Sequence, residues 1–237
     1  MDTLLAMEPV LITLAQDEGV DRSLLDYVIS GGPIGAIILI LSLVAIGMIS
    51  AQIFRIRREK LSPEALVEEL RPALAESDVE RAIELCSDEE NASYLARVVG
   101  SSLTRSARSP FGMLELRSTV EETGQLEIDR LYRLTDGIGL IASIAPMLGL
   151  LGTVVGMVGA FDAITMAEGP ARPDQLAGSI STALITTVLG LIVAIPCTSA
   201  YTYLRNRIDH LTTEINELID ELIAPLEQAS ASQGQGS

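Results

Sequence analysis

The chain has 237 residues and a net charge of −16, and 48% of its residues are apolar although only 3% are aromatic. This charge argues against nucleic-acid binding, because phosphates need a basic patch and none stands out in the sequence. The two cysteines, Cys86 and Cys197, give no indication of a disulfide framework.

The first 33 residues are predicted to form an acidic, amphipathic segment on the periplasmic side of a membrane. They lack the basic start of a secretory signal and carry Glu8 inside their apolar part. We therefore expect the first apolar run, Ile34–Phe54, to stay in place as transmembrane helix 1. The break at Gly31, Gly32 and Pro33 separates the two segments.

Residues 55–136 are too polar to enter lipid and are predicted to be a cytoplasmic helical insert. Ser62-Pro63-Glu64 predicts a helix start with proline at the first helical position. Ser77-Asp78-Val79-Glu80 is typical of a capping box, and a third helix is predicted at 91–106. No proline occurs from 111 to 136, so we expect that helix to continue directly into the next span.

Two further uncharged runs are predicted as transmembrane helices 2 and 3, at 137–161 and 176–204. Each is longer than the ~20 residues that cross a bilayer core. The loop at 162–175 contains Gly169-Pro170 and Pro173 and is predicted to be a periplasmic turn. Three buried helices of a soluble protein are the disfavoured alternative, because such helices rarely remain uncharged over this length.

The distribution of basic residues predicts the orientation. Fourteen of the sixteen Lys and Arg residues lie between the first two spans or after the third, and only Arg22 and Arg172 lie on the other side. Because cytoplasmic loops carry the excess of Lys and Arg, the N-terminus is predicted to be periplasmic and the C-terminus cytoplasmic.

After the third span, residues 205–227 are predicted to be a cytoplasmic helical tail. Its apolar residues recur at steps of four and three: Leu204, Ile208, Leu211, Ile215, Leu218, Leu222 and Leu226. This spacing fits either a coiled-coil seam or a packed helix stripe. Residues 228–237 are rich in Ser, Gln and Gly and are predicted to be disordered.

Small residues along the second span predict close helix packing. Gly149, Gly152, Gly156 and Gly159 follow one another at steps of three, four and three, which places them along one face of a helix. In lipid, small residues of this kind let helix backbones approach closely. Three further positions are expected to shape this packing: Pro146 in the second span, and Gly190 and Pro196 in the third.

The spans contain hydroxyl groups but no charged side chain. The second span contains the hydroxyls of Ser143 and Thr153, and the third contains, among others, those of Ser179, Ser181, Thr182, Thr186, Thr187, Thr198 and Ser199. Each could bond a carbonyl of its own helix, or together they could line a narrow hydrated path. An ion path usually needs a titratable group at mid-membrane, so a conducting site would need a carboxylate from another polypeptide.

The second and third spans resemble the MotA/TolQ/ExbB proton-channel family, and ExbB- or TolQ-like members most. The matching stretches are Ala145–Val154 with Gly156, Met157 and Phe161, then Ile180–Thr187 and Gly190–Pro196. The order of one span, a cytoplasmic insert, two spans and a helical tail agrees with the same family over nearly the whole chain. The first 33 residues match nothing in it.

The resemblance implies an all-α integral membrane protein that forms a homo-pentamer around the single membrane helices of a smaller ExbD- or TolR-like partner. An Asp of that partner would carry the protons, and a TonB- or TolA-like protein would transmit the work. Thr153 and Thr187 match the pore-lining threonines of the family, with Thr182 and Thr186 as further pathway candidates. Thr182 stands where ExbB-like proteins have a Glu, so a relay carboxylate is missing there.

The function predicted from this resemblance is a stator-type proton-channel subunit of the bacterial inner membrane, which converts proton motive force into mechanical work without a cofactor or metal. A purely structural membrane scaffold is the alternative. A solute carrier is disfavoured because no inverted repeat or buried charge is apparent. An enzyme is disfavoured because no nucleophile–base pair, metal cluster or phosphate loop appears in the sequence.

Overall fold

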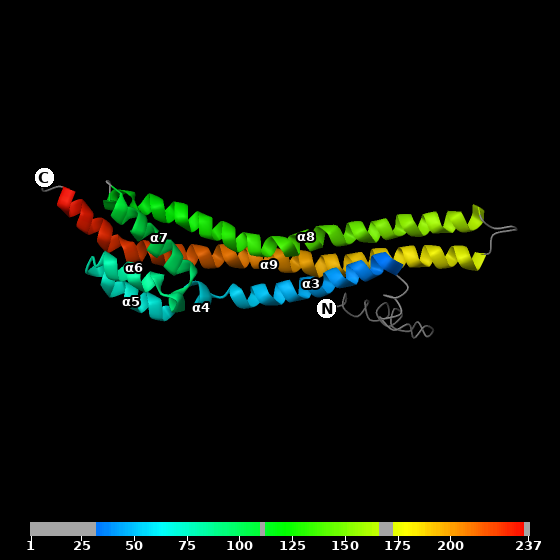
Figure 1. Ribbon diagram of the computed structural model, residues 1–237, viewed down its shortest axis with the longest axis horizontal. Helices are drawn as coiled ribbons and strands as arrows, with labels where there is room; N and C mark the ends of the chain where they lie inside the picture. The colour runs from blue at the N-terminus through cyan, green and yellow to red at the C-terminus, as the bar shows by residue number, and fades with distance from the viewer. Residues whose placement is uncertain (1–31, 110–111, 166–172, 235–237) are drawn as a thin grey trace, which may run out of the picture. The chain divides into compact units, whose positions relative to one another are not determined.

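The computed structural model describes residues 32–109, 112–165 and 173–234, and these residues form helices and their connections, with no strand among them (Figure 1). Three helices dominate: α3 (Gly32–Arg55), α8 (Leu116–Thr165) and α9 (Pro173–Gly234). The others are α4 (Arg58–Leu61), α5 (Glu64–Ala75), α6 (Val79–Ser87) and α7 (Tyr94–Arg108), with the 3₁₀ turns η1 (Glu89–Asn91) and η2 (Gly112–Glu115).

The three long helices are each long and apolar enough to cross a membrane. Their most apolar windows have mean hydropathies of 2.6, 2.1 and 2.2, and only 17%, 28% and 28% of those windows are buried within the chain. Large apolar side chains such as Leu43, Leu150 and Ile195 therefore remain exposed. An exposed apolar surface of this extent needs lipid or another protein to cover it.

The chain divides into two compact units. The described residues of 32–40 and 146–191 form unit 1, and the described residues of 41–145 and 192–234 form unit 2. Within each unit, α8 and α9 are antiparallel neighbours (Figure 1). The boundary in α8 falls at Pro146, a residue that lacks the N–H of a regular helical hydrogen bond.

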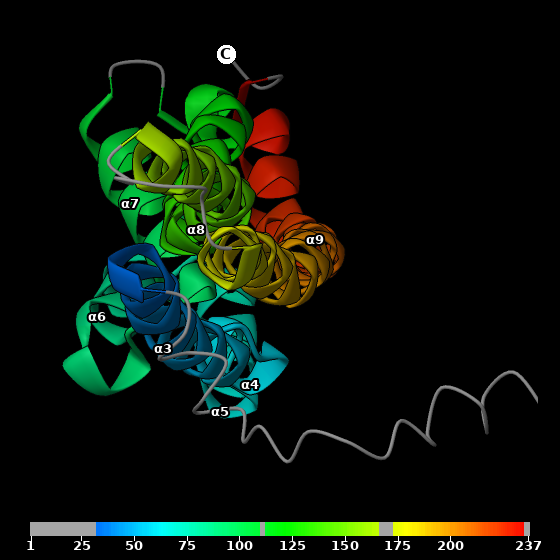
Figure 2. The same ribbon diagram turned by 90° about the vertical axis from the view of Figure 1, so that its right-hand side faces the viewer.

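In unit 2 the short helices enclose a continuous apolar core with α8 and α9. Helix α6 packs against both α5 and α7 (Figure 2). Leu70, Leu74, Leu95 and Val99 from the short helices are fully buried and belong to the same cluster as Ile208 of α9. The burial of this many aliphatic side chains, each stabilising by about 1.5–3 kcal/mol, holds the insert on the two long helices.

The apolar residues of the predicted tail belong to this core. Leu204, Ile208, Leu211, Ile215, Leu222 and Leu226 are each 2% exposed or less, and Leu218 is partly buried beside the fully buried Ile219. Of the two interpretations left open, the stripe therefore packs within the chain. Helix α9 continues past residue 227, the expected end of the helical tail, to Gly234; residues 235–237 lie outside the described residues.

The helix starts in the insert differ from the prediction by one to three residues. Ser77 is not an N-cap: it has φ 60° and closes α5, while the Asp78 N–H donates to the Ala73 carbonyl at 2.9 Å. This is the Schellman arrangement at a helix C-terminus, so Asp78 caps α6 instead, accepting from the Arg81 N–H. Pro63 precedes the first residue of α5.

The other boundaries follow from the same local chemistry. The third helix of the insert begins after its Ser93 cap rather than at residue 91, and it extends to Arg108. Helix α8 runs unbroken from Leu116 to Thr165, so the continuous helix predicted from the lack of proline is confirmed. Residues 1–31 and 166–172, which hold most of the N-terminal segment and half of the predicted loop, lie outside the described residues.

Candidate functional site

Three glycines of α8 lie against α9 in unit 1. A Cβ atom on Gly149 would lie 3.0 Å from the Thr186 carbonyl oxygen, and one on Gly156 would lie 2.6 Å from the Ala183 Cβ. A Cβ on Gly152 would overlap the Thr186 side chain. The two backbones thus approach more closely than any larger residue would permit. We call this contact the glycine seam: Gly149, Gly152 and Gly156 against Ser179, Ala183, Thr186 and Thr187.

Thr186 fills the notch that Gly152 leaves. Its side chain is buried, 2% exposed, and its hydroxyl donates to the Ala183 carbonyl at 2.7 Å on its own helix. Sequence reasoning grouped Thr186 with the pathway hydroxyls, whereas the structure puts its side chain between α8 and α9. The hydrogen bond within its own helix satisfies the buried hydroxyl. Thr186 therefore contributes to the contact between α8 and α9 through the fit of its side chain.

The side chains of Thr187 and Thr153 are half-buried, and their hydroxyls donate hydrogen bonds to neighbouring carbonyl groups. The Thr187 hydroxyl crosses between helices and donates to the Gly149 carbonyl at 3.0 Å. The Thr153 hydroxyl donates to the Leu150 carbonyl of its own helix at 2.6 Å. The two threonines matched to the family motif thus donate to the carbonyls of consecutive residues of α8.

The remaining candidates are spread more widely. Thr182 is half-buried and makes no side-chain hydrogen bond to any residue that the structure describes. Gly159 is exposed, with nothing within 4 Å of the position of a Cβ, so it lies outside the glycine seam. Gly190 is buried, Pro146 is half-buried and Pro196 is exposed.

The chemistry available at the glycine seam is hydrogen bonding without charge. No Asp, Glu, Lys, Arg or His occurs in 34–54, 137–161 or 176–204. Among the described residues, no group of three or more His, Cys, Asp or Glu side chains could hold a metal ion. The seam can bind water or a polar group brought by another molecule, but its own side chains cannot take up and release protons near neutral pH.

Unit 2 contains a polar cluster that the sequence did not reveal. The Tyr132 hydroxyl of α8 donates to Asp209 of α9, and this hydrogen bond raises the pKa of Tyr132. The Arg205 guanidinium lies 4.3 Å from the centre of the Tyr132 ring and donates to the Tyr201 hydroxyl at 2.7 Å. A second bond between long helices runs from Gln52 Nε2 of α3 to the Leu134 carbonyl, at 2.9 Å.

Tyr94 joins the insert to α9. Its ring is fully buried, and its hydroxyl donates to Asn216 Oδ1 at 2.9 Å. Burial raises the pKa of Tyr94 to about 12, so this hydroxyl stays protonated as a donor. The only sequence signal for these contacts was the rarity of aromatic residues, with five Tyr in the whole chain.

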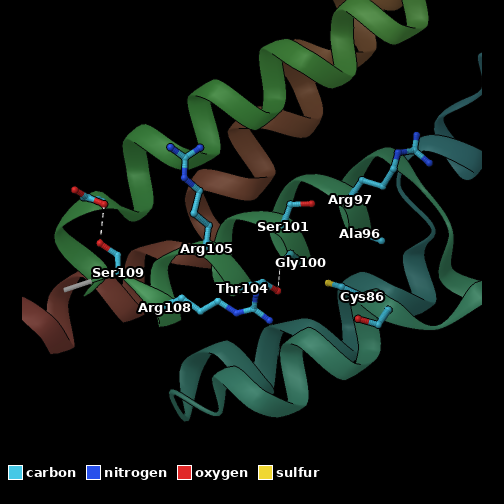
Figure 3. A pocket seen from close by; sticks show the side chains of 11 residues that line it. Cys86, Ala96, Arg97, Gly100, Ser101, Thr104, Arg105, Arg108 and Ser109 are labelled. Atoms are coloured by element: carbon cyan, nitrogen blue, oxygen red, sulfur yellow. Dashed lines mark hydrogen bonds between the residues drawn. The ribbon is translucent and has the colours of Figure 1, made fainter. Parts of the chain in front are cut away.

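An open groove of about 760 Å³ lies between α6 and α7 in unit 2 (Figure 3). Arginines line it, but Arg97 bonds Glu127 at 2.5 Å and Arg105 bonds Glu122 at 2.6 Å. These carboxylates of α8 neutralise most of the positive charge, so the groove lacks the excess charge of an anion site. Cys86 also lines the groove, and burial raises the pKa of its thiol to about 11, which leaves little reactive thiolate near neutral pH.

Comparison with known proteins identifies a family and several relatives of this chain. The sequence model of the MotA/TolQ/ExbB proton channel family matches residues 49–217. An ExbB-like biopolymer transport protein of Synechocystis is 31% identical over 194 residues, which cover 81% of this chain and 72% of the relative.

Two further relatives match over shorter stretches. TolQ of the Tol-Pal system of Haemophilus influenzae is 37% identical over 95 residues, 40% of this chain and 41% of that protein. An ExbB homologue of Methanothermobacter thermautotrophicus is 41% identical over 110 residues, 45% of this chain and 38% of that protein. The chain thus spans less than half the length of these two relatives.

Proposed function

Because the chain belongs to the MotA/TolQ/ExbB proton channel family, we propose that it is the shell-forming subunit of a proton-driven machine in the bacterial inner membrane. The observation that carries this proposal is the pair of hydroxyls, Thr153 and Thr187, on consecutive α8 carbonyls inside uncharged helices. Such a site can hydrate or bind a moving proton carrier without the cost of burying a charge of its own.

The proposed assembly is a homo-pentamer that encloses the membrane helices of an ExbD- or TolR-like protein. This chain has no Asp, Glu, Lys, Arg or His in its spans, so the partner supplies the acid that takes and releases protons. A TonB- or TolA-like protein would then receive the force. A membrane potential of 100 mV supplies about 2.3 kcal/mol per charge, so useful work needs several protons.

The proposed topology has a periplasmic N-terminus and a cytoplasmic C-terminus, with the residues between α3 and the apolar part of α8 in the cytoplasm. The uneven distribution of Lys and Arg supports it. Cysteine-accessibility labelling in intact cells tests it: a Cys introduced at Thr213 should be protected from an impermeant thiol reagent applied outside. Rapid labelling of that position would contradict the topology.

The test of function is a double variant, Thr153→Val with Thr187→Val, in the complex reconstituted into liposomes that contain a pH-sensitive dye. We expect proton flux to be abolished while the complex keeps its size on a sizing column. Thr198→Val is the matched control, because this hydroxyl also bonds its own helix, at the Ala194 carbonyl. Unchanged flux in the double variant would contradict a pore at these threonines.

A membrane scaffold without conduction is the second candidate, and the glycine seam favours it, since close packing needs no proton path. The scaffold predicts that hydroxyl loss has no effect on the work of the complex. Purification of the complex, followed by identification of any small co-eluting membrane protein, separates the two candidates further. Full activity without a companion chain would refute the proposed partner.

A further inference from the structure

A small pocket lies in unit 2 between the end of α3 and the middle of α9. Its volume is about 190 Å³, and we call it the boundary pocket; its lining residues are Ile53, Ile56, Arg57, Tyr203, Leu204 and Arg207. Ile56 and Leu204 are 3% and 1% exposed and belong to the core of unit 2. The pocket therefore combines a well-packed apolar wall with two arginines.

The boundary pocket lies where two uncharged helical runs end. Arg55 is the first charged residue after the run on α3, and Arg205 is the first after the run on α9. Because residues from both ends line one pocket, the two spans reach the edge of the apolar layer of a bilayer at the same level. Phe54 and Tyr203, at 60% and 61% exposed, are placed at this level, where aromatic residues are enriched in membrane proteins.

The two arginines of the pocket carry positive charge that no carboxylate neutralises. Among the residues that the structure describes, neither Arg57 nor Arg207 makes an ion pair. The Arg57 guanidinium lies over the Phe54 ring, 5.1 Å from its centre. Residues 55–60 and 205–210 together contain six Lys and Arg residues but only two carboxylates. An anion therefore finds here the excess of positive charge that the groove between α6 and α7 lacks.

We propose that the boundary pocket binds the phosphodiester headgroup of an anionic glycerophospholipid, such as phosphatidylglycerol, from the cytoplasmic leaflet. Guanidinium groups bind phosphate oxygens through paired, charge-assisted hydrogen bonds. The Tyr203 hydroxyl, which bonds no residue that the structure describes, adds a further donor. Basic residues just cytoplasmic of a membrane helix attract anionic lipid. The choice of leaflet rests on the proposed topology, whereas the site itself is independent of proton conduction.

The size of the pocket determines which part of a lipid enters it. A volume of about 190 Å³ corresponds to about six water molecules in the liquid, which accommodates a phosphate with its glycerol but not the acyl chains. The chains would lie on the neighbouring apolar surface, where Ile53 and Phe54 are exposed. A zwitterionic headgroup also carries an ammonium group, which the two arginines repel. The pocket and its surroundings thus favour an anionic lipid over both a zwitterionic lipid and free phosphate.

The experiment titrates the full-length protein, in the assembled form in which it purifies in detergent, with phosphatidylglycerol and separately with phosphatidylcholine of the same acyl chains. Native mass spectrometry counts the lipids that remain bound. The pocket variants are Arg57→Gln and Arg207→Gln. Arg55→Gln is the matched control, because it removes the same charge at the same boundary from an exposed residue that does not line the pocket.

We expect the wild type to bind phosphatidylglycerol more tightly than phosphatidylcholine. Each pocket variant should lose about tenfold in affinity for phosphatidylglycerol, as for the loss of a hydrogen bond to a charged group, and Arg55→Gln should change little. Phosphatidylglycerol should also raise the melting temperature of the wild type more than that of the pocket variants, since a ligand stabilises the folded state that binds it.

Equal binding of the two lipids to the wild type would overturn the inference. An equal loss in Arg55→Gln and in the pocket variants would also overturn it, because the attraction would then be a diffuse property of the surface. Displacement of the lipid by inorganic phosphate at the same concentration would refute a lipid as the ligand. Each of these results leaves the proposed function standing, because neither arginine lies in the uncharged spans.

The variants should keep their fold, because Arg57 and Arg207 are both exposed. Equal melting temperatures without added lipid, and an unchanged size on a sizing column, check this. If Arg57→Gln differs from the wild type in either respect, Arg207→Gln decides the question, because Arg207 lies within the regular helix α9 whereas Arg57 lies in the link between α3 and α4.

Discussion

Gly152→Ala should destabilise the pair formed by α8 and α9, although alanine is the better helix former. The new Cβ would overlap the Thr186 side chain and lie 2.6 Å from its Cβ, so a helix must shift. Overpacking of this kind costs about 1–3 kcal/mol, against a gain of about 1 kcal/mol from replacing glycine in a helix. Gly159→Ala is the matched control, because its Cβ would meet nothing within 4 Å.

The assay is thermal denaturation of the two variants in the same detergent, followed by circular dichroism. We expect Gly152→Ala to melt below the wild type and Gly159→Ala to melt at or above it. The difference between the two should be about 1–3 kcal/mol, because the gain in helix propensity is shared and cancels. Adding Thr186→Gly to Gly152→Ala removes the overlap and should recover part of the loss, as expected for contacting residues.

Equal melting of the two glycine variants would refute the reasoning, since it would mean that α8 and α9 are not in close contact at Gly152. The seam joins helices of one chain. A larger substitution such as Gly152→Leu should therefore first separate this helix pair, and any loss of the oligomer would follow from that separation. A Gly152→Leu protein that melts like the wild-type monomer but no longer forms the oligomer would contradict this order of events.

Three further predictions concern unit 2. Tyr94→Phe should lower the free energy of unfolding by about 1–3 kcal/mol, since it leaves Asn216 Oδ1 without its donor; a melting temperature equal to that of the wild type would contradict this. Iodoacetamide should alkylate Cys86 about a hundredfold more slowly than an ordinary cysteine at pH 8, because a pKa of about 11 leaves little thiolate. Its rate should rise with pH up to that value, and rapid labelling in a mass-spectrometric time course would refute it. Arg205→Met should lower the melting temperature, because methionine removes the cation over the Tyr132 ring, a contact worth about 0.5–2 kcal/mol; no change would contradict this contribution.

The helices could be predicted from the sequence because their signals are local. The uncharged run 34–54 and the lack of proline from 111 to 136 correspond to α3 and to the unbroken α8. The start of α6 was misplaced by one residue for a physical reason. Ser77 and Asp78 are both good caps, and the choice between them depended on the backbone of Ser77, which ends the preceding helix with positive φ.

The pairing of the candidate residues could be predicted only in part. Glycine spacing indicated the face of α8 that meets another helix, but periodicity does not say which helix, nor that Thr186 lies opposite Gly152. Thr153 and Thr187 came from a motif, whereas their hydrogen-bond acceptors depend on the register between α8 and α9. The Tyr132–Asp209 bond joins residues 77 positions apart, a separation at which a single sequence carries no pairing signal.

The glycine seam leaves almost all of the bulky aliphatic surface of its helices free. Met147, Leu150 and Leu184 are 67%, 63% and 60% exposed, while the contact that holds the pair together uses glycine, alanine and threonine. Substitutions on the outer faces can therefore accumulate without disturbing the pair itself. In such a chain the surface that contacts other subunits or lipid can change during evolution while the contact between α8 and α9 stays constant.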